Sequence, residues 1–411
     1  MTPEQVAALQ RKTVRVLFTG QVMMGFGFGA AVTMGALLAE SITGSAAFSG
    51  AGTTFVTLGS AVVAIPLARL ASARGRATAL AAGSTMAVLG AILVIWAAAV
   101  SSFLMLCAGI FLLGAAGASN LQARFAAADL PSGNRVGRSI SIVVWATTIG
   151  AVTGPNLFAP GDAIGQALGL PHLTGPFLIT IASQIVGTLV FQLGLRPDPL
   201  LTAQKLNGTD AGSRPKQGIR AGLAILRSNS TARYAVLSNA LSHMVMVAVM
   251  SMTPVHMEHM GLTLVIVGFT ISLHVAGMYA FSPIFGWLAD KLGSVRVIIL
   301  GQFVYLVALA FAGFGSQDRV SISIGLLLLG LGWSAATVSG AALLTTSLSK
   351  DEKVMVQGVS DSLMSFSGAI GGALSGVILA IAAYPGLNAA MLIPVAIVVI
   401  ATAPRLVKKS S

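Results

Sequence analysis

The chain contains 411 residues, of which 55% are hydrophobic and 9% are charged, and its mean hydropathy is +0.88. A soluble protein of this length cannot cover its surface with so few polar side chains, so the composition excludes a water-soluble globular protein. In so apolar a chain, the formal net charge of +12 indicates membrane orientation rather than a nucleic-acid surface. The composition therefore predicts an all-α integral membrane protein.

Twelve long apolar stretches are predicted to cross the membrane as helices. A hydrocarbon core of about 30 Å requires about 20 helical residues, and each stretch is about that long or longer. The longest hydrophilic stretch follows the sixth span, which predicts two six-helix bundles, residues 1–196 and 233–411, joined by a cytoplasmic loop at 197–232. The predicted spans are 14–40, 47–72, 77–100, 101–124, 137–160, 174–195, 234–255, 262–289, 295–315, 320–347, 355–383 and 386–404.

Positive charges identify the cytoplasmic side, because short loops rich in lysine and arginine remain in the cytoplasm. Basic residues precede the first span, follow the last and occupy alternate connections, among them Arg74, Lys216, Lys291 and Lys353. This pattern predicts that both termini are cytoplasmic and that the basic connections face membrane lipid rather than nucleic acid. The first apolar stretch is longer than the core of a signal peptide, and Cys107 is the only cysteine, so neither a cleaved leader nor an internal disulfide is expected.

The connection after the eighth predicted span carries a glycine-bounded motif, Gly286-Trp287-Leu288-Ala289-Asp290-Lys291-Leu292-Gly293. It resembles the loop signature of the major facilitator superfamily, in which a tight glycine turn and an aspartate hold neighbouring helices in one access state. The matching place in the first half, residues 68–76, has Ser72 where the aspartate is expected, so we expect a weaker lock there. The resemblance implies the superfamily fold, in which two bundles rock about a site in mid-membrane.

Ionisable side chains inside a membrane are costly and usually functional. Among the acidic residues, only Asp361 falls within a predicted span, near its cytoplasmic end. A proton-driven exporter of cationic drugs usually has a carboxylate in its first bundle, and none is predicted there. The segment 150–155 partly resembles an antiporter motif, but Phe158 and Ala159 replace its glycines, so we interpret it as a packing kink.

Methionine and histidine concentrate in the second half of the chain. His243, Met246 and Met250 share one helical face at i, i+3 and i+7, and His274 and Met278 share another at i, i+4. Thioether sulfur is a soft ligand that favours Cu(I), and imidazole also binds copper well. The spacing therefore predicts a copper site formed by Met246, Met250, His274 and Met278, although methionine in a membrane helix is most often a packing residue.

A second group of soft ligands lies between these two spans. We expect an external turn here, in which His256, Met257, His259 and Met260 act with His243 as auxiliary ligands. At a rise of about 1.5 Å per residue, Met250 would lie nearest the outside, with Met246 and His243 successively deeper. The groups would then form a ladder along which copper descends.

The methionine and histidine pairs resemble the mark of the CcoA-like copper transporters (the CalT family), a branch of the major facilitator superfamily. That mark is Met-x-x-x-Met in span seven and His-x-x-x-Met in span eight. The resemblance implies a copper importer of the bacterial cytoplasmic (inner) membrane that supplies assembly of cbb3-type cytochrome c oxidase. Copper would be the transported substrate, with no prosthetic group, a cytoplasmic copper acceptor as partner and a monomeric state. Since Cys107 is alone, a cysteine-pair redox step is not expected.

Two alternatives remain open from the sequence. In one, the chain is a proton-coupled importer or exporter of a small organic solute or drug, and the methionine stripe is an adaptable apolar wall. In the other, it is a membrane sensor or assembly factor that binds copper without turnover, although so little soluble chain leaves few residues for docking. An enzyme is not expected, because the sequence shows neither a nucleophile and base arrangement nor a phosphate-binding loop. The driving force stays undetermined, with Asp361 or a histidine as candidates to carry a proton.

Overall fold

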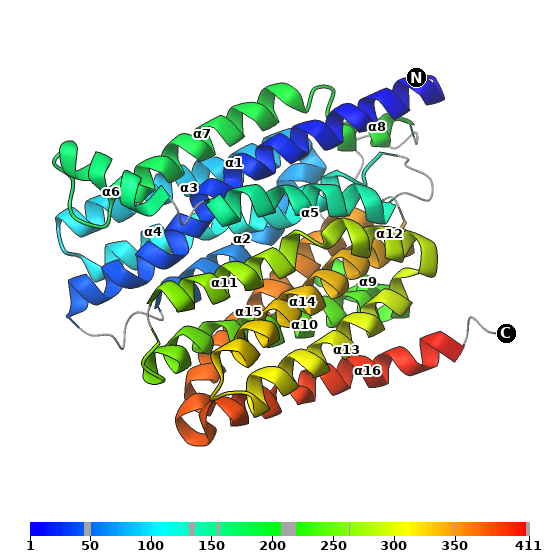
Figure 1. Ribbon diagram of the computed structural model, residues 1–411. Coiled ribbons are helices and arrows are strands. Elements are labelled where there is room, and N and C mark those ends of the chain that lie inside the picture. The colour runs from blue at the N-terminus through cyan, green and yellow to red at the C-terminus, as the bar shows by residue number, and fades with distance from the viewer. Residues whose placement is uncertain are drawn as a thin grey trace. The chain divides into compact units, whose positions relative to one another are not determined.

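A computed structural model describes residues 1–44, 51–130, 136–153, 157–206, 219–262, 264–349 and 351–407. Helices account for the regular secondary structure of these ranges (Figure 1). They are α1 (Pro3–Thr43), α2 (Ala51–Arg74), α3 (Arg76–Ala99), α4 (Phe103–Ala126), α5 (Val136–Thr153), α6 (Phe158–Ala167), α7 (Gly175–Gly194), α8 (Pro199–Leu206), α9 (Ile219–Ser228), α10 (Ser230–His259), α11 (Leu264–Tyr279), α12 (Ser282–Leu292), α13 (Ser294–Phe314), α14 (Arg319–Ser347), α15 (Lys353–Ala390) and α16 (Leu392–Val407).

Within the described residues, 11 helical stretches are long and apolar enough to cross a membrane. The first predicted span, 14–40, lies inside α1, which is helical from Pro3 to Thr43. The prediction of an all-helical membrane protein is therefore confirmed. Part of the predicted cytoplasmic loop 197–232 also forms a helix, α9.

Three predicted spans differ in detail from the observed helices. The predicted span 137–160 covers α5, which is helical to Thr153, and the start of α6 at Phe158, and residues 154–156 between them lie outside the described residues. The predicted span 262–289 consists of α11 and α12, and α12 has a proline in its first turn, where the missing N–H cannot continue a preceding helix. The predicted end at Ala383 coincides with a break in α15, since that residue has φ 55° and ψ −175°.

The chain divides into two compact units that do not coincide with its sequence halves. Unit 1 comprises Met1–Gly133, Ala146–Ile225 and Ser349–Ser362, and unit 2 comprises Asn134–Trp145, Leu226–Leu348 and Leu363–Ser411. Two helices, α5 and α15, therefore each begin in one unit and continue in the other.

In unit 1, α4 packs against α1, α2 and α3, and glycine allows close approaches of these helices. A Cβ added to Gly90 of α3 would lie 2.6 Å from the carbonyl oxygen of Gly109 in α4 and 2.8 Å from the backbone nitrogen of Leu113. Both obstacles are backbone atoms, which cannot move aside as a flexible side chain can. The small residues thus let two membrane helices approach more closely than any side chain would permit.

We expect the substitution Gly90→Ala to destabilise the protein by about 1–3 kcal/mol, because the added methyl group forces α3 and α4 apart. Gly376→Ala is the matched control, since a Cβ at Gly376 meets nothing within 4 Å. Thermal unfolding in detergent, followed by tryptophan fluorescence, would measure both variants. Equal unfolding temperatures for the two variants would contradict close packing at Gly90.

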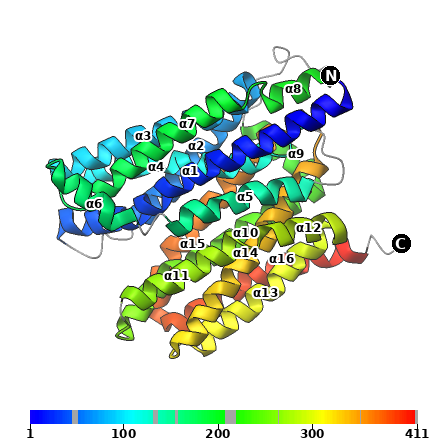
Figure 2. The same ribbon diagram turned by 45° about the horizontal axis from the view of Figure 1, so that its top comes forward.

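In unit 2, α14 is the central helix, with α10, α11, α12 and α13 packed against it (Figure 2). A cluster of buried side chains fills the space among these helices, and its members include Met246, Met257, Met278, Tyr305 and Trp333. Met246 and Met278 of the predicted copper site, and the predicted auxiliary ligand Met257, therefore contribute to an apolar interior. The histidines of the second half also belong to unit 2, namely His243, His256, His259 and His274.

Candidate functional site

A glycine turn precedes a helix in each half of the chain. Gly75, before α3, has φ 89°, and Gly293, before α13, has φ 92°. Side chains disfavour this left-handed region, so both turns require glycine. Beside the second turn, the Lys291 ammonium lies 4.7 Å from the centre of the Trp287 ring. The two loops that the sequence pairs with each other thus share one backbone geometry.

Asp290, in the last turn of α12, caps the start of a second helix. Its Oδ1 accepts a hydrogen bond from the backbone N–H of Gly137 at 2.8 Å, and its Oδ2 accepts one from Arg138 at 2.9 Å. A Cβ on Gly286 would lie 2.6 Å from the carbonyl oxygen of Gly137, so the two helices touch backbone to backbone. Because α5 begins at Val136, the carboxylate satisfies N–H groups that have no partner inside the helix and lies at the positive end of its dipole.

We expect Asp290→Ala to lower the free energy of unfolding by about 1 kcal/mol, the usual effect of losing a cap. Asp290→Asn should lose much less, because asparagine caps helix starts about as well as aspartate. Denaturant unfolding in detergent micelles would compare the two variants. A change of equal size in both would mean that the charge, and not the hydrogen-bonded cap, holds α5.

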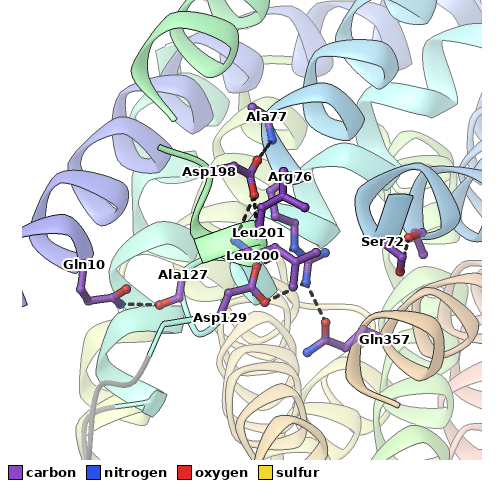
Figure 3. Close-up of polar contacts among 11 residues, drawn as sticks. Gln10, Ser72, Arg76, Ala77, Ala127, Asp129, Asp198, Leu200, Leu201 and Gln357 are labelled. Carbon is purple, nitrogen blue, oxygen red and sulfur yellow. Dashed lines mark hydrogen bonds and ion pairs between the residues drawn. The ribbon is translucent and has the colours of Figure 1, made fainter. Parts of the chain in front are cut away.

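In the first half, a different residue makes the long-range contacts. Ser72 donates its hydroxyl hydrogen bond to Ala68 of its own helix at 3.1 Å. Arg76, at the start of α3, donates to both carboxylate oxygens of Asp129, at 2.8 and 3.1 Å, and to Oε1 of Gln357 in α15 at 2.9 Å (Figure 3). The Arg76 side chain is fully buried, so this arginine joins three segments of unit 1 from within.

Asp198 connects the same region to α8. Its Oδ2 accepts from the backbone N–H of Ala77 at 2.8 Å, and its Oδ1 accepts from Leu200 at 3.0 Å and Leu201 at 3.1 Å (Figure 3). One carboxylate thus caps the first turns of both α3 and α8, where backbone N–H groups lack intrahelical partners.

A second buried ion pair lies nearby in unit 1. The Arg124 Nη2 of α4 lies 2.5 Å from Oδ1 of Asp361 in α15, and the two side chains are 2% and 0% exposed. The Arg124 guanidinium also lies 4.8 Å from the centre of the Phe125 ring. The sequence placed Asp361 inside a predicted span, and Arg124 is the last residue of the predicted span 101–124. That position was the signal that could have placed the Arg124 side chain inside the membrane, although not beside Asp361.

The four residues of the predicted copper site all lie in unit 2. Met246 and Met278 are buried members of its apolar cluster, and Met250 packs against the cluster from its edge. His274 is fully buried, and its Nδ1 lies 2.8 Å from the carbonyl oxygen of Leu326. A carbonyl only accepts, so Nδ1 carries the hydrogen and Nε2 has a lone pair; this Nε2 has no hydrogen-bond partner among the described residues.

The predicted auxiliary ligands do not form an external turn. Residues 256–259 are helical and complete α10, so consecutive side chains point in different directions. His256 hydrogen-bonds through Nε2 to the carbonyl of Ser316 at 2.7 Å and stacks on Tyr384, with ring centres 4.3 Å apart. Met257 is buried in the apolar cluster, His259 is exposed, and Met260 packs against the cluster. The expected external turn is therefore wrong for residues 256–259, which continue α10.

His243 belongs to an aromatic group that the sequence did not reveal. The Trp333 indole donates to His243 Nδ1 at 3.0 Å, and the two ring centres are 6.2 Å apart. Tyr279 packs against Trp333 in a T-shaped arrangement, with the two ring centres 5.6 Å apart. Trp333 is buried, whereas His243 and Tyr279 are partly exposed. These three side chains come from α10, α14 and α11, so no local pattern could have connected them.

In the part of the chain that the structure describes, no three His, Cys, Asp or Glu side chains gather closely enough to hold a metal ion. A copper site here would depend on thioether sulfur, with His274 as its imidazole.

Comparison with known proteins places this arrangement in a family. The model of the Major Facilitator Superfamily matches residues 17–280 and 235–410. An uncharacterized MFS-type transporter of Bacillus subtilis (strain 168), YdeG, is 37% identical over 406 residues, which cover 96% of this chain and 94% of the relative. The riboflavin transporter RfnT of Brucella anthropi is 25% identical over 359 residues, 87% of this chain and 86% of the relative.

Solved structures show the same fold. The human organic anion transporter MFSD10 (TETRAN) superposes with a TM-score of 0.76 at 15% identity, covering 98% of this chain and 100% of that one. A bacterial homologue of the iron transporter ferroportin, in an outward-facing state, superposes with a TM-score of 0.72 at 14% identity over 95% and 98% of the two chains. The chain belongs to the Major Facilitator Superfamily of multi-pass membrane transporters.

Proposed function

We propose that this protein is a secondary transporter of a small organic solute that contains a planar ring. The observation that carries the proposal is the group formed by His243, Trp333 and Tyr279 in unit 2. Aromatic side chains with a polar edge bind planar rings by stacking and fix them by hydrogen bonds.

The three side chains lie at mid-depth in their helices. Trp333 is 14 residues from each end of α14, whose limits are 319 and 347. His243 is 13 residues after Ser230, the first residue of α10, or about 20 Å along the helix axis. Tyr279 ends α11, midway along the membrane span formed by α11 and α12. Solutes bind at mid-depth in transporters of this type.

Unit 2 also contains buried polar side chains, two of which are adjacent in sequence to members of the aromatic group. Gln302 Nε2 donates to the hydroxyl of Ser242, next to His243, at 3.1 Å. The other amide atom of that side chain, Oε1, and the hydroxyl of Ser334, next to Trp333, are buried without a hydrogen-bond partner among the described residues. Such groups are expensive to bury unless a ligand or water binds them.

Riboflavin is the first compound to test. Its flat heteroaromatic ring and polar ribityl chain combine the two features above, and a relative that covers most of this chain is a riboflavin transporter. The distribution of basic residues supports a cytoplasmic-membrane location with both termini inside.

Copper import is the second candidate, and one observation favours it. The Nδ1–H of His274 is held by the Leu326 carbonyl while Nε2 is left without a partner, which is how an imidazole ligand is oriented by its surroundings. Against it, Met246 and Met278 are packed in an apolar cluster, and Nδ1 of His243 is occupied by Trp333. If copper is the cargo, His274, Met246, Met250 and Met278 would carry it, with supply of the cbb3-type oxidase as its destination.

Proteoliposomes containing the purified protein would test both cargoes, with labelled riboflavin and radioactive copper offered separately under an imposed proton gradient. We expect riboflavin to enter faster than in empty vesicles, copper to enter at the rate of empty vesicles, and excess unlabelled riboflavin to compete. Copper uptake that is lost in His274→Leu would overturn the organic-solute proposal in favour of the second candidate. If neither cargo is taken up, both substrate proposals are overturned and only membership of the Major Facilitator Superfamily remains.

A further inference from the structure

The Arg124–Asp361 pair of unit 1 is isolated from water and incompletely satisfied. Arg124 Nη2 contacts Asp361 Oδ1, whereas Arg124 Nε and Nη1 and Asp361 Oδ2 have no hydrogen-bond partner among the described residues. A guanidinium carries five N–H donors and a carboxylate can accept several hydrogen bonds. Most of the capacity of this pair is therefore unused, which leaves charge attraction as its main source of stability.

Other charged groups of unit 1 lie near the pair. Arg76 of α3 binds Gln357, one turn before Asp361 on the same face of α15, and is itself paired with Asp129. Asp198, at the start of α8, caps the first turn of α3. Two arginines thus bind α15 one turn apart, and each has one carboxylate partner.

Two further contacts of this segment involve uncharged residues. The hydroxyl of Ser362 donates to the carbonyl of Ala61 in α2 at 2.7 Å. Gly222 of α9 lies against Val359 and Met355 of α15, because a Cβ there would be 2.8 Å from a Val359 methyl group. Among the described residues, the positive charges that act on Asp361 are those of Arg124 and Arg76.

Alternating access separates helices at one end of such a transporter and then at the other. If α15 moves away from α4, Arg124 stays charged because arginine does not deprotonate in proteins, but an unpaired carboxylate in an apolar interior is strongly unfavourable. The carboxylate can remove that cost by taking a proton, whereas the arginine cannot.

We propose that Asp361 is the proton-binding residue of the transport cycle and that Arg124 is the group that displaces the proton. When the pair opens, a proton from water forms an O–H bond at Oδ2, the oxygen without a partner. When the pair closes, the attraction of Arg124 for the carboxylate returns that proton to water. The proposal depends on secondary transport by the chain, but not on the identity of the solute.

Infrared spectroscopy of the purified protein in lipid tests proton binding without any solute. As the pH is lowered, we expect the wild type to gain the C=O band of a protonated carboxyl shielded from water, and Asp361→Asn to lack it. Glu4→Gln, at an exposed position of the first turn of α1, is the control and should keep the band. An unchanged band in Asp361→Asn would overturn the proposal, and Asp361→Glu, which should shift the band rather than remove it, gives a second test if the asparagine variant does not fold.

Transport provides the second arm, with whichever cargo the proteoliposomes accept. We expect Asp361→Asn to retain exchange of labelled for unlabelled cargo but to lose at least tenfold of the accumulation driven by a proton gradient, since a neutral side chain cannot cycle a proton. Retained proton-driven accumulation in Asp361→Asn would overturn the proposal. If the infrared band behaves as expected and no cargo is transported, the solute proposal fails while the proton site stands.

Discussion

Replacing Arg124 with alanine should destabilise the protein by about 3–5 kcal/mol, because the change leaves the buried carboxylate of Asp361 without its partner. The cost arises from the charge that remains, not from the contact that is lost. It should therefore diminish at acidic pH, where Asp361 can take a proton and become neutral. Unfolding of the purified variant in detergent at several pH values would measure both effects.

A double substitution separates these two causes. In Arg124→Met with Asp361→Leu, both charges are replaced by apolar side chains, and stability should return to near that of the wild type. Arg220→Ala, in the connecting helix α9 where the side chain is exposed, is the control and should change stability by less than about 0.5 kcal/mol. A double variant as unstable as Arg124→Ala would show that packing, and not charge, determines the loss.

Replacing Trp333 should have the largest effect on transport. Trp333→Ala removes a buried indole from the centre of unit 2 and should cost about 3–5 kcal/mol in stability, with loss of transport as a consequence. Trp333→Phe is more informative, because it keeps an aromatic ring but removes the N–H that donates to His243. A neutral hydrogen bond contributes about 0.5–1.5 kcal/mol, so the fold should survive.

For Trp333→Phe we expect about tenfold weaker apparent affinity for riboflavin, the effect of about 1.4 kcal/mol. Trp96→Phe is the matched control, since Trp96 of α3 is 61% exposed and should leave transport unchanged. The comparison requires KM values from proteoliposomes with equal amounts of each protein. Unchanged affinity in Trp333→Phe would separate the aromatic group from the solute site.

Hydropathy predicted the membrane helices because lipid exposure acts along the whole length of each span. The Gly75 and Gly293 turns were predictable for a similar reason, as a positive φ is a local requirement. The partners of Arg76, Arg124 and Asp290 were not predictable, because each lies far away in the sequence and is selected by packing. Ser72 illustrates the difference. Its replacement of the expected aspartate predicted a weaker lock, but no local pattern indicated that Arg76 and Arg124 bind α15.

The soft-ligand ladder illustrates the limit of helical spacing as evidence. The i, i+4 rule places Met246 and Met250 on one face, but it does not say whether that face meets a solute or other side chains. In the structure this face belongs to an apolar cluster. The expected turn at 256–260 was wrong because residues 256–259 continue α10, which directs Met257 inward and leaves His259 exposed.

The double cap made by Asp198 has a consequence for sequence change over time. A Cβ on Gly75 would lie 2.5 Å from one of the Asp198 carboxylate oxygens, so any side chain at position 75 would displace the group that caps α3 and α8. Conversely, a larger residue at position 198 would press on the glycine turn. We therefore expect the two positions to vary together among descendants of this chain, with loss of the glycine tolerated only where the carboxylate has already been replaced.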